Sequence, residues 1–365
     1  MRKFFNLLVI VFFTVNLSAQ TKEEPSGKLS GNFFIDYYYN MQRDSSLNSL
    51  PNKVLSGDEE LHGLKIRRVY LTYDYKYSSK ISSRFRLESD ETNFTTNLSG
   101  DKANKFGMFI KDAFVKLNYF KSNTLWIGIQ ATPAFEISES FWGNRYIEKT
   151  IMDLRGAVPS RDLAISLRGN IDSKGLFKYW VMYGNSNAGL PESDIYKRLF
   201  GHVEISPVKD LSVTLYSDYQ FKKSISDAFK ANHQLSNNIL TSAFFIGYKK
   251  KNKMSVGVDT YYRIVDNGYK LSNKYENQEG YGLSAFAMYY IKPQINVFAR
   301  FDRFEPNLDN NSKGDTRNLY IGGLCYNYNE KLAISPNIFI ETFEKTGNID
   351  IENSITPRLT LTWAF

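Results

Sequence analysis

The segment 358–365 alternates apolar and polar side chains and finishes on Phe365. The side chains of a β-strand point alternately to its two faces, so this segment has one polar and one apolar face. The apolar face is formed by Leu359, Leu361, Trp363 and Phe365. A final strand with aromatic residues at the level of the membrane interface is typical of a transmembrane β-barrel. The segment therefore predicts a barrel that it closes.

Residues 1–19 have the parts of a secretory signal peptide: a basic start, an apolar stretch over 4–15 and the small-residue site Leu17-Ser18-Ala19. We expect cleavage there, leaving 20–27 as a short periplasmic segment. The apolar stretch is shorter than the roughly 20 residues that span a bilayer as a helix. No other stretch is long and apolar enough, so a membrane-embedded form of this chain has to be a barrel.

Composition is compatible with a barrel and argues against other classes. The chain has 25 Tyr and 27 Phe but only 10 Pro, and its mean hydropathy is −0.39. A barrel allows negative hydropathy because only alternate strand residues face lipid. The net charge of +8, or +6 without the two basic residues of the signal, comes with no nucleic-acid-binding motif, so we expect no nucleic-acid partner. The single cysteine, Cys325, is expected to be a small buried packing residue.

After residue 28 the sequence resolves into about sixteen strand-like segments of barrel-spanning length, with no sustained helical repeat. The predicted fold is an all-β, antiparallel transmembrane barrel over 28–365. Short and long connections alternate, for example 121–122 and 132–160. Because outer-membrane barrels have short periplasmic turns and longer external loops, both termini are expected in the periplasm. The segments lie near 28–41, 64–77, 80–92, 106–120, 123–131, 161–170, 176–185, 196–206, 210–222, 240–249, 252–265, 279–291, 293–305, 317–328, 331–343 and 356–365.

The face opposite the apolar one is charged in many of these segments, which predicts a water-filled lumen. A barrel of this size is too wide for side chains to fill. The candidate pore-lining cations are Arg68, Arg84, Arg86, Lys116, Arg168, Lys178, Arg198, Arg263 and Arg300. Acidic residues share this face, so an alternative is that cations and carboxylates pair across neighbouring strands and stiffen the wall.

The third external loop, 132–160, is too apolar for a solvated loop, with Phe135, Trp142 and Ile151 among its residues. We expect it to fold into the barrel and narrow the pore, which would bury these side chains. The alternative is a lid on top of the barrel or a contact with a neighbouring subunit. The candidate constriction residues are Trp142, Arg145, Lys149 and Arg155.

Several stretches resemble the phosphate-selective porin O/P family of outer-membrane porins. They are 128–133 (GIQATP), 141–145 (FWGNR) with Glu148-Lys149, 160–163 (SRDL), and the earlier 66–71 and 85–88. The resemblance implies a sixteen-stranded, trimeric porin with an infolded third loop and an anion-favouring lumen. Phosphate is one of the anions it suggests.

Together these features predict a Gram-negative outer-membrane porin that passes small hydrophilic solutes, preferably anions, by passive diffusion. We expect no enzymatic activity, cofactor or metal. The expected partners are outer-membrane lipid, two further copies of the chain in a homotrimer, and the barrel-assembly machinery acting on the Phe365 strand. Two alternatives stay open. One is a barrel without a channel, a surface enzyme or adhesive scaffold, for which His202 is the one histidine in a predicted strand. The other is an uncharged solute stacking on Trp126, Trp180 or Tyr216.

Overall fold

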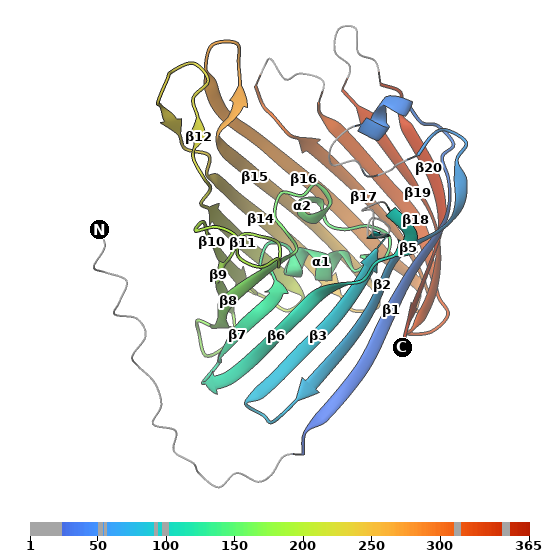
Figure 1. Ribbon diagram of the computed structural model, residues 1–365. Helices are drawn as coiled ribbons and strands as arrows, with labels where there is room; N and C mark the ends of the chain where they lie inside the picture. The colour runs from blue at the N-terminus through green and yellow to red at the C-terminus, as the bar shows by residue number, and fades with distance from the viewer. Residues whose placement is uncertain are drawn as a thin grey trace.

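The computed structural model describes residues 24–49, 54, 57–90, 94–96, 102–309, 315–344 and 351–365. The expected signal peptide lies outside them and stays a prediction. In the described part of the chain, sixteen strands form a closed antiparallel barrel in which the last strand pairs with the first (Figure 1). Each barrel strand pairs with the barrel strand that precedes it in the chain, so the predicted barrel is confirmed.

All sixteen predicted segments coincide with barrel strands. The largest differences are at the β15–β16 hairpin, where both strands extend several residues further than expected. The barrel strands are β1 (Ser26–Tyr39), β2 (His62–Lys76), β3 (Ile81–Asp90), β6 (Phe109–Phe120), β7 (Asn123–Ala131), β8 (Arg161–Asn170), β9 (Phe177–Gly184), β10 (Arg198–Ile205), β11 (Leu211–Gln220), β14 (Ile239–Lys250), β15 (Met254–Lys270), β16 (Tyr275–Lys292), β17 (Ile295–Glu305), β18 (Arg317–Asn327), β19 (Leu332–Phe343) and β20 (Ser354–Ala364).

The described part also contains short elements outside the barrel wall. Two small hairpins, β4 (Phe94–Thr96) with β5 (Lys102–Phe106) and β12 (Ile225–Ser226) with β13 (Gln234–Leu235), extend long connections, and η1 (Ser45–Ser49) follows β1. The α-helices are α1 (Glu136–Trp142) and α2 (Ile151–Leu154). Neither helix is long and apolar enough to cross a membrane, and this holds for the described residues only.

The seam between β20 and β1 shows the alternation expected of the final strand. Trp363 and Phe365 are about two-fifths exposed on the outer surface, whereas Thr360 is fully buried inside. The Trp363 ring stacks on Phe33 of β1, with 5.4 Å between ring centroids. Phe365 exchanges two backbone hydrogen bonds with Gly31, and its ring occupies the space that a side chain at Gly31 would need. The aromatic end of the chain therefore closes the barrel, as expected.

A β-bulge in β2 breaks the alternation near the middle of the strand. Phe34 pairs with Arg68 and Ile35 with Ile66, so Arg67 is an extra residue opposite β1. A bulge of this kind re-aims a side chain. Both Arg67 and Arg68 are consequently buried inside the barrel.

A second bulge lies in β6. Arg86 pairs with Asp112 and Leu87 with Ile110, which leaves Lys111 unpaired in the ladder. The Lys111 ammonium lies 2.8 Å from the carboxylate of Glu88, which is buried inside the barrel. Strict alternation assigns Arg67 and Lys111 to the lipid face, so the two bulges add two cations to the interior.

The segment 132–160, which we call L3, connects β7 to β8 and carries α1 and α2 inside the barrel (Figure 1). Trp142 and Ile147 are fully buried in a cluster with Phe286, Phe298 and other inward side chains of β14–β19. Ile151 and Met152 join a second cluster against β9–β11 and β15. Each such side chain contributes about 1.5–3 kcal/mol when it leaves water. The infolded loop is confirmed, and the lid alternative is wrong.

A lysine introduced on the two faces of β3 should have unequal effects. Phe85→Lys places a charge in the middle of the exposed outer surface and is expected to lower the free energy of unfolding in lipid vesicles by about 2–4 kcal/mol. Ser82→Lys adds the same charge on the inward face of the same strand and is expected to change it by less than about 1 kcal/mol. Urea titration in phosphocholine vesicles measures both. Equal losses would contradict the assigned facing.

Candidate functional site

The backbone of L3 between its two helices is held by arginines of the barrel wall. Buried carbonyl groups outside regular structure need hydrogen-bond donors. Arg67 Nη1 donates to the carbonyls of Tyr146, at 3.0 Å, and of Ile147. Arg300 Nη1 donates to the carbonyl of Lys149. Two strands on either side of the loop therefore supply the donors that the infolded backbone requires.

Ion pairs hold the same segment. Glu148 lies 3.3 Å from Arg67, which also contacts Asp36 at 3.5 Å, and Arg358 lies 3.4 Å from that aspartate. Burial raises the pKa of Glu148, but the nearby charges of Arg67, Arg358 and Lys149 outweigh it and lower the pKa to about 2. Glu148 is thus ionised across the neutral range and is anchored by its cationic neighbours.

Arg145 and Arg155 are also engaged in holding L3. Arg145 bridges Glu139 of α1, at 2.7 Å, and Asp153 of α2, at 3.1 Å. Arg155 has a fully buried side chain that pairs with Glu341 of β19 at 2.9 Å. These contacts join the two helices to each other and to the wall.

The predicted constriction residues are therefore placed differently from one another. Trp142 has no exposed surface, and its indole Nε1 donates to the Glu148 carbonyl, so it packs behind L3 and away from the lumen. Arg155 is likewise buried, so its charge faces Glu341 rather than water. Arg145 is partly exposed but neutralised by two carboxylates. Lys149 is half-buried and, among the described residues, has no carboxylate within 4 Å of its ammonium.

The open side of the lumen lies between α1 and the wall of β3, β6, β7 and β8. The helices of L3 pack against β14–β16. A partly open cavity of about 150 Å³ lies on the other side of α1. Glu136 and Glu139 of α1 line it, facing Arg84 and Arg161 of the wall. L3 thus presents carboxylates to the passage, where the sequence predicted cations, and the barrel wall supplies the positive side.

Positive charge on this wall is only partly neutralised by its direct contacts. Asp112 is shared by Arg86, at 3.3 Å, and Arg161, at 2.5 Å. Glu88 is shared in the same way by Arg68 and Lys111. Two carboxylates therefore each serve two cations.

Lys116 adds an unneutralised charge to the same wall. It has no carboxylate within 4 Å in the described ranges, and its ammonium lies 3.9 Å from the centre of the Trp126 ring. A cation over an aromatic face is stabilised without being neutralised. Lys116 is thus a wall cation without a direct carboxylate partner, next to Trp126, which lines the cavity.

Arg168 lies between two indole rings at the short-turn end of the passage. Its guanidinium is 3.6 Å from the centre of the Trp126 ring and 3.1 Å from that of Trp180, and it pairs with Glu136 at 3.4 Å. Because Arg168 covers these ring faces, they are not free to stack on a sugar. Trp180 and Tyr216 belong to the cluster packed against L3, and a cavity of about 830 Å³ lined by Arg168, Lys178 and His202 opens nearby.

The remaining predicted cations are mostly paired with carboxylates across or along the strands. Arg84 binds Asp74 with two hydrogen bonds of 2.7 and 3.0 Å, and Lys178 pairs with Glu204 at 3.2 Å. Arg198 pairs with Asp218, and Arg300 with Asp302; both arginines are buried. The pairing alternative therefore describes much of the wall, and Arg263 is an exception considered below.

Sequence reasoning missed Arg67, Lys111, Arg161, Glu136 and Glu139 as site residues. Arg67 and Lys111 are directed inward by bulges, which a strict period of two does not reveal. The wall that L3 packs against could have been recognised from the sequence. The inward positions of β14, β16 and β17 include Phe245, Phe286 and Phe298, whereas inward positions elsewhere are mostly charged or polar.

The residues of the enzyme alternative do not assemble into a recognisable catalytic group. Among the described residues, His202 is mostly buried and makes no hydrogen bond to a serine. The described residues also contain no group of three or more histidine, cysteine, aspartate or glutamate side chains arranged to hold a metal ion. Cys325 is buried as expected, and its sulfur accepts a hydrogen bond of 3.0 Å from Tyr146 of L3.

Solved structures resemble the barrel over nearly its whole length. An anion-selective porin from Comamonas acidovorans superimposes with a TM-score of 0.64 at 13% identity, covering 94% of this chain and 100% of that one. The outer-membrane channel DcaP of Acinetobacter baumannii gives 0.63 at 12%, covering 95% and 99%. OmpT, an outer-membrane protein of Vibrio cholerae, gives 0.60 at 10%, covering 95% and 100%.

These likenesses show that the fold is that of outer-membrane porins. The sequence matches no protein-family model and none of the curated proteins. The resemblance to the phosphate-selective O/P family therefore stays a prediction from its motifs.

Removing the arginine that clamps L3 should be far more damaging than removing a wall arginine. Arg67→Gln leaves Asp36 and Glu148 with reduced compensation and is expected to lower the free energy of unfolding by about 3–5 kcal/mol. Arg84→Gln breaks a pair whose side chains are 31% and 39% exposed and is expected to cost about 1 kcal/mol or less. Denaturant titration compares the two variants. Equal losses would mean that Arg67 does not anchor the loop.

The pH dependence of the clamp follows from the lowered pKa of Glu148. A carboxylate whose pKa falls on folding stabilises the folded state above its unfolded pKa and loses this effect as pH falls towards about 2. At pH 6 the free energy of unfolding of the wild type should be about 3 kcal/mol higher than that of Glu148→Gln. The difference should shrink between pH values of about 4.5 and 2. A difference that is constant over this interval would contradict the ionised clamp.

Proposed function

We propose that this protein is an outer-membrane porin that passes small hydrophilic solutes by passive diffusion and prefers anions. The observation that carries the proposal is the asymmetric interior. The helices of L3 are packed on one wall, and a partly open cavity is left beside the wall that carries Arg84, Arg86 and Arg161. The likeness to porins, one of them described as anion-selective, supports the proposal.

The anion preference rests on the wall cations that share or lack a carboxylate. A single charge acts on an ion 4 Å away with only about 1 kcal/mol in bulk water. Several cations along a narrow passage add their effects where bulk water is partly excluded. Arg86, Arg161 and Lys116 lie on this wall, whereas the predicted loop cations Arg145 and Arg155 are neutralised.

The carboxylates of α1 set the opposite side of the passage. Glu136 and Glu139 face the basic wall across the same cavity. A solute that carries both a positive and a negative group would be oriented between the carboxylates of α1 and the cations of the wall. A simple anion would pass along the cations of the wall. Phosphate is one anion to be tested, and the proposal does not depend on it.

The proposal also covers the location of the protein in the cell, its assembly and its oligomeric state. We assign it to the Gram-negative outer membrane, after export by the signal peptide and assembly through the closing strand that ends at Phe365. Outer-membrane lipid would cover the apolar outer surface. We also propose a homotrimer, since OmpT of Vibrio cholerae has been described in a trimer form. No enzymatic activity, cofactor or metal is assigned.

Neutralising Lys116 tests the proposal. In planar bilayers under a potassium chloride gradient, wild type should conduct in steps with a reversal potential that favours chloride. Lys116→Gln leaves no carboxylate unpaired, and it should lower the chloride-to-potassium permeability ratio by about two- to fivefold, equivalent to about 0.4–1 kcal/mol. Lys209→Gln removes the same charge from an exposed turn and should leave the ratio unchanged.

Two results would contradict the proposal in different ways. A folded protein that never conducts would overturn the channel and favour a barrel without one. Conductance with equal or cation-favouring permeability would overturn only the anion preference.

A further inference from the structure

Arg263 of β15 is set apart from the other lumen arginines by its lack of a counterion. Among the described residues, Arg263 makes no ion pair and no hydrogen bond, and its Nε is buried without a partner. The nearest candidate counterion is Asp218. Its two oxygens already accept hydrogen bonds of 2.6 Å from Arg198 and from the Tyr216 hydroxyl. Within the described part of the chain, the charge of Arg263 therefore has no direct counterion.

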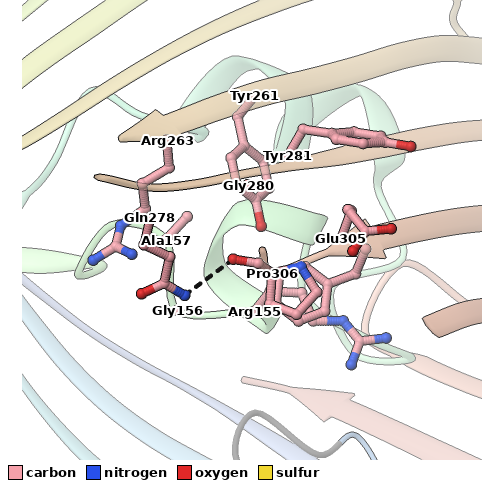
Figure 2. Close-up of a pocket in the computed structure, with 11 residues that line it drawn as sticks. Arg155, Gly156, Ala157, Tyr261, Arg263, Gln278, Gly280, Tyr281, Glu305 and Pro306 are labelled. Atoms are coloured by element: carbon pink, nitrogen blue, oxygen red, sulfur yellow. Dashed lines mark hydrogen bonds between the residues drawn. The ribbon is translucent and has the colours of Figure 1, made fainter. Parts of the chain in front are cut away.

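This arginine lines a pocket between L3 and the long-loop ends of β15, β16 and β17. The pocket has a volume of about 180 Å³ and is partly open. Arg263 and Tyr261 both line this pocket, and in Figure 2 the Gln278 amide lies between the Arg263 guanidinium and the Tyr261 hydroxyl. The amide of Gln278 is held by its 3.1 Å hydrogen bond to the Pro306 carbonyl (Figure 2).

Two glycines of β16 allow the Pro306 loop and the Tyr261 ring to approach the strand closely beside the pocket. Gly280 lies directly opposite Arg263 in the sheet. A Cβ at Gly280 would lie 2.6 Å from the Pro306 carbonyl oxygen, so the close approach of that loop requires glycine. A Cβ at Gly282 would lie 2.3 Å from the ring of Tyr261, which rests over it. The ring is thereby fixed with its hydroxyl towards the pocket.

The rest of the lining adds hydrogen-bonding groups without neutralising Arg263. Arg155 reaches the pocket but pairs with Glu341. Glu305, the acidic lining residue, occupies an outward position of β17, pairs with Arg303 at 3.9 Å and accepts a hydrogen bond from Thr316.

We propose that this pocket binds the carboxylate group of a small organic acid, with Arg263 and Tyr261 as its recognition residues. A guanidinium presents parallel N–H donors that match the two oxygens of a carboxylate. The Tyr261 hydroxyl supplies a further donor, and the walls formed by Tyr261 and Phe304 accept a short apolar body. A doubly charged phosphate is expected to bind more weakly than a carboxylate, because only one cation without a direct counterion lines the pocket.

This inference rests on the proposed function, since it names a solute class for the entrance of the channel. The long-loop end of an outer-membrane barrel faces the outside. The pocket would therefore hold an organic acid before it reaches the passage beside L3.

Saturation-transfer NMR on the full protein in detergent measures binding whether or not the barrel conducts. Butyrate and its neutral isostere butyramide are observed directly, and inorganic phosphate, which has no carbon-bound protons, is measured by its competition with butyrate. Wild type should bind butyrate more tightly than either. Arg263→Gln should weaken butyrate binding by about tenfold or more, and Tyr261→Phe by about threefold.

The control is Lys209→Gln, which removes one positive charge from an exposed turn that does not line the pocket and should leave butyrate binding unchanged. If Arg263→Gln does not fold, Arg263→Lys keeps the charge without the planar fork and should weaken binding severalfold.

Unchanged binding in both Arg263 variants would overturn the site. Equal binding of butyramide would overturn carboxylate recognition, as would tighter binding of phosphate. Butyrate binding that depends on Arg263 in a protein that does not conduct would uphold the site while the proposed channel fails.

Discussion

The attachment of L3 to one side of the barrel is the interaction on which the rest of the interior depends. A barrel of this size encloses more space than its wall residues fill, so the path left for water is set by what is folded into it. Trp142 and Ile147 remove a large apolar area from water against β14–β19. Arg67 and Arg300 satisfy the carbonyls that the infolded backbone carries. Apolar burial gives the loop its affinity for this wall, and the arginine contacts fix its position.

This attachment divides the charged residues of the lumen into two groups. Those under or within L3, such as Glu148 and Arg155, are buried and serve the structure, because an ion removed from water needs a partner. Those on the opposite wall remain near the water path, and there the pairing is incomplete at Asp112 and Glu88. The same residue types thus stabilise the fold on one side and line the open cavity on the other.

Much of the barrel could be predicted from the sequence, because a period of two and the alternation of short and long connections are local properties of the chain. The strand positions, the outward face of Leu71 and Phe85, and the inward face of Arg84 all follow from them. The candidate site could be predicted only in part. Its segment and many of its cations were expected, but the bulges at Arg67 and Lys111 are shifts in pairing with another strand, which a single strand's pattern does not contain.

The sequence by itself determined the barrel, its closing strand and the inward folding of a loop too apolar for solvent. The tertiary structure alone decided which wall the loop covers and therefore which charges face water. Trp142 and Arg155 belong to the loop predicted to narrow the pore, yet both are buried against its support. Arg263 was one basic lumen position among many, and it differs from the other predicted lumen arginines because Asp218 is already occupied by Arg198 and Tyr216. The physical reason is that pairing and burial depend on neighbours brought together from distant strands, whereas side-chain alternation depends on the strand alone.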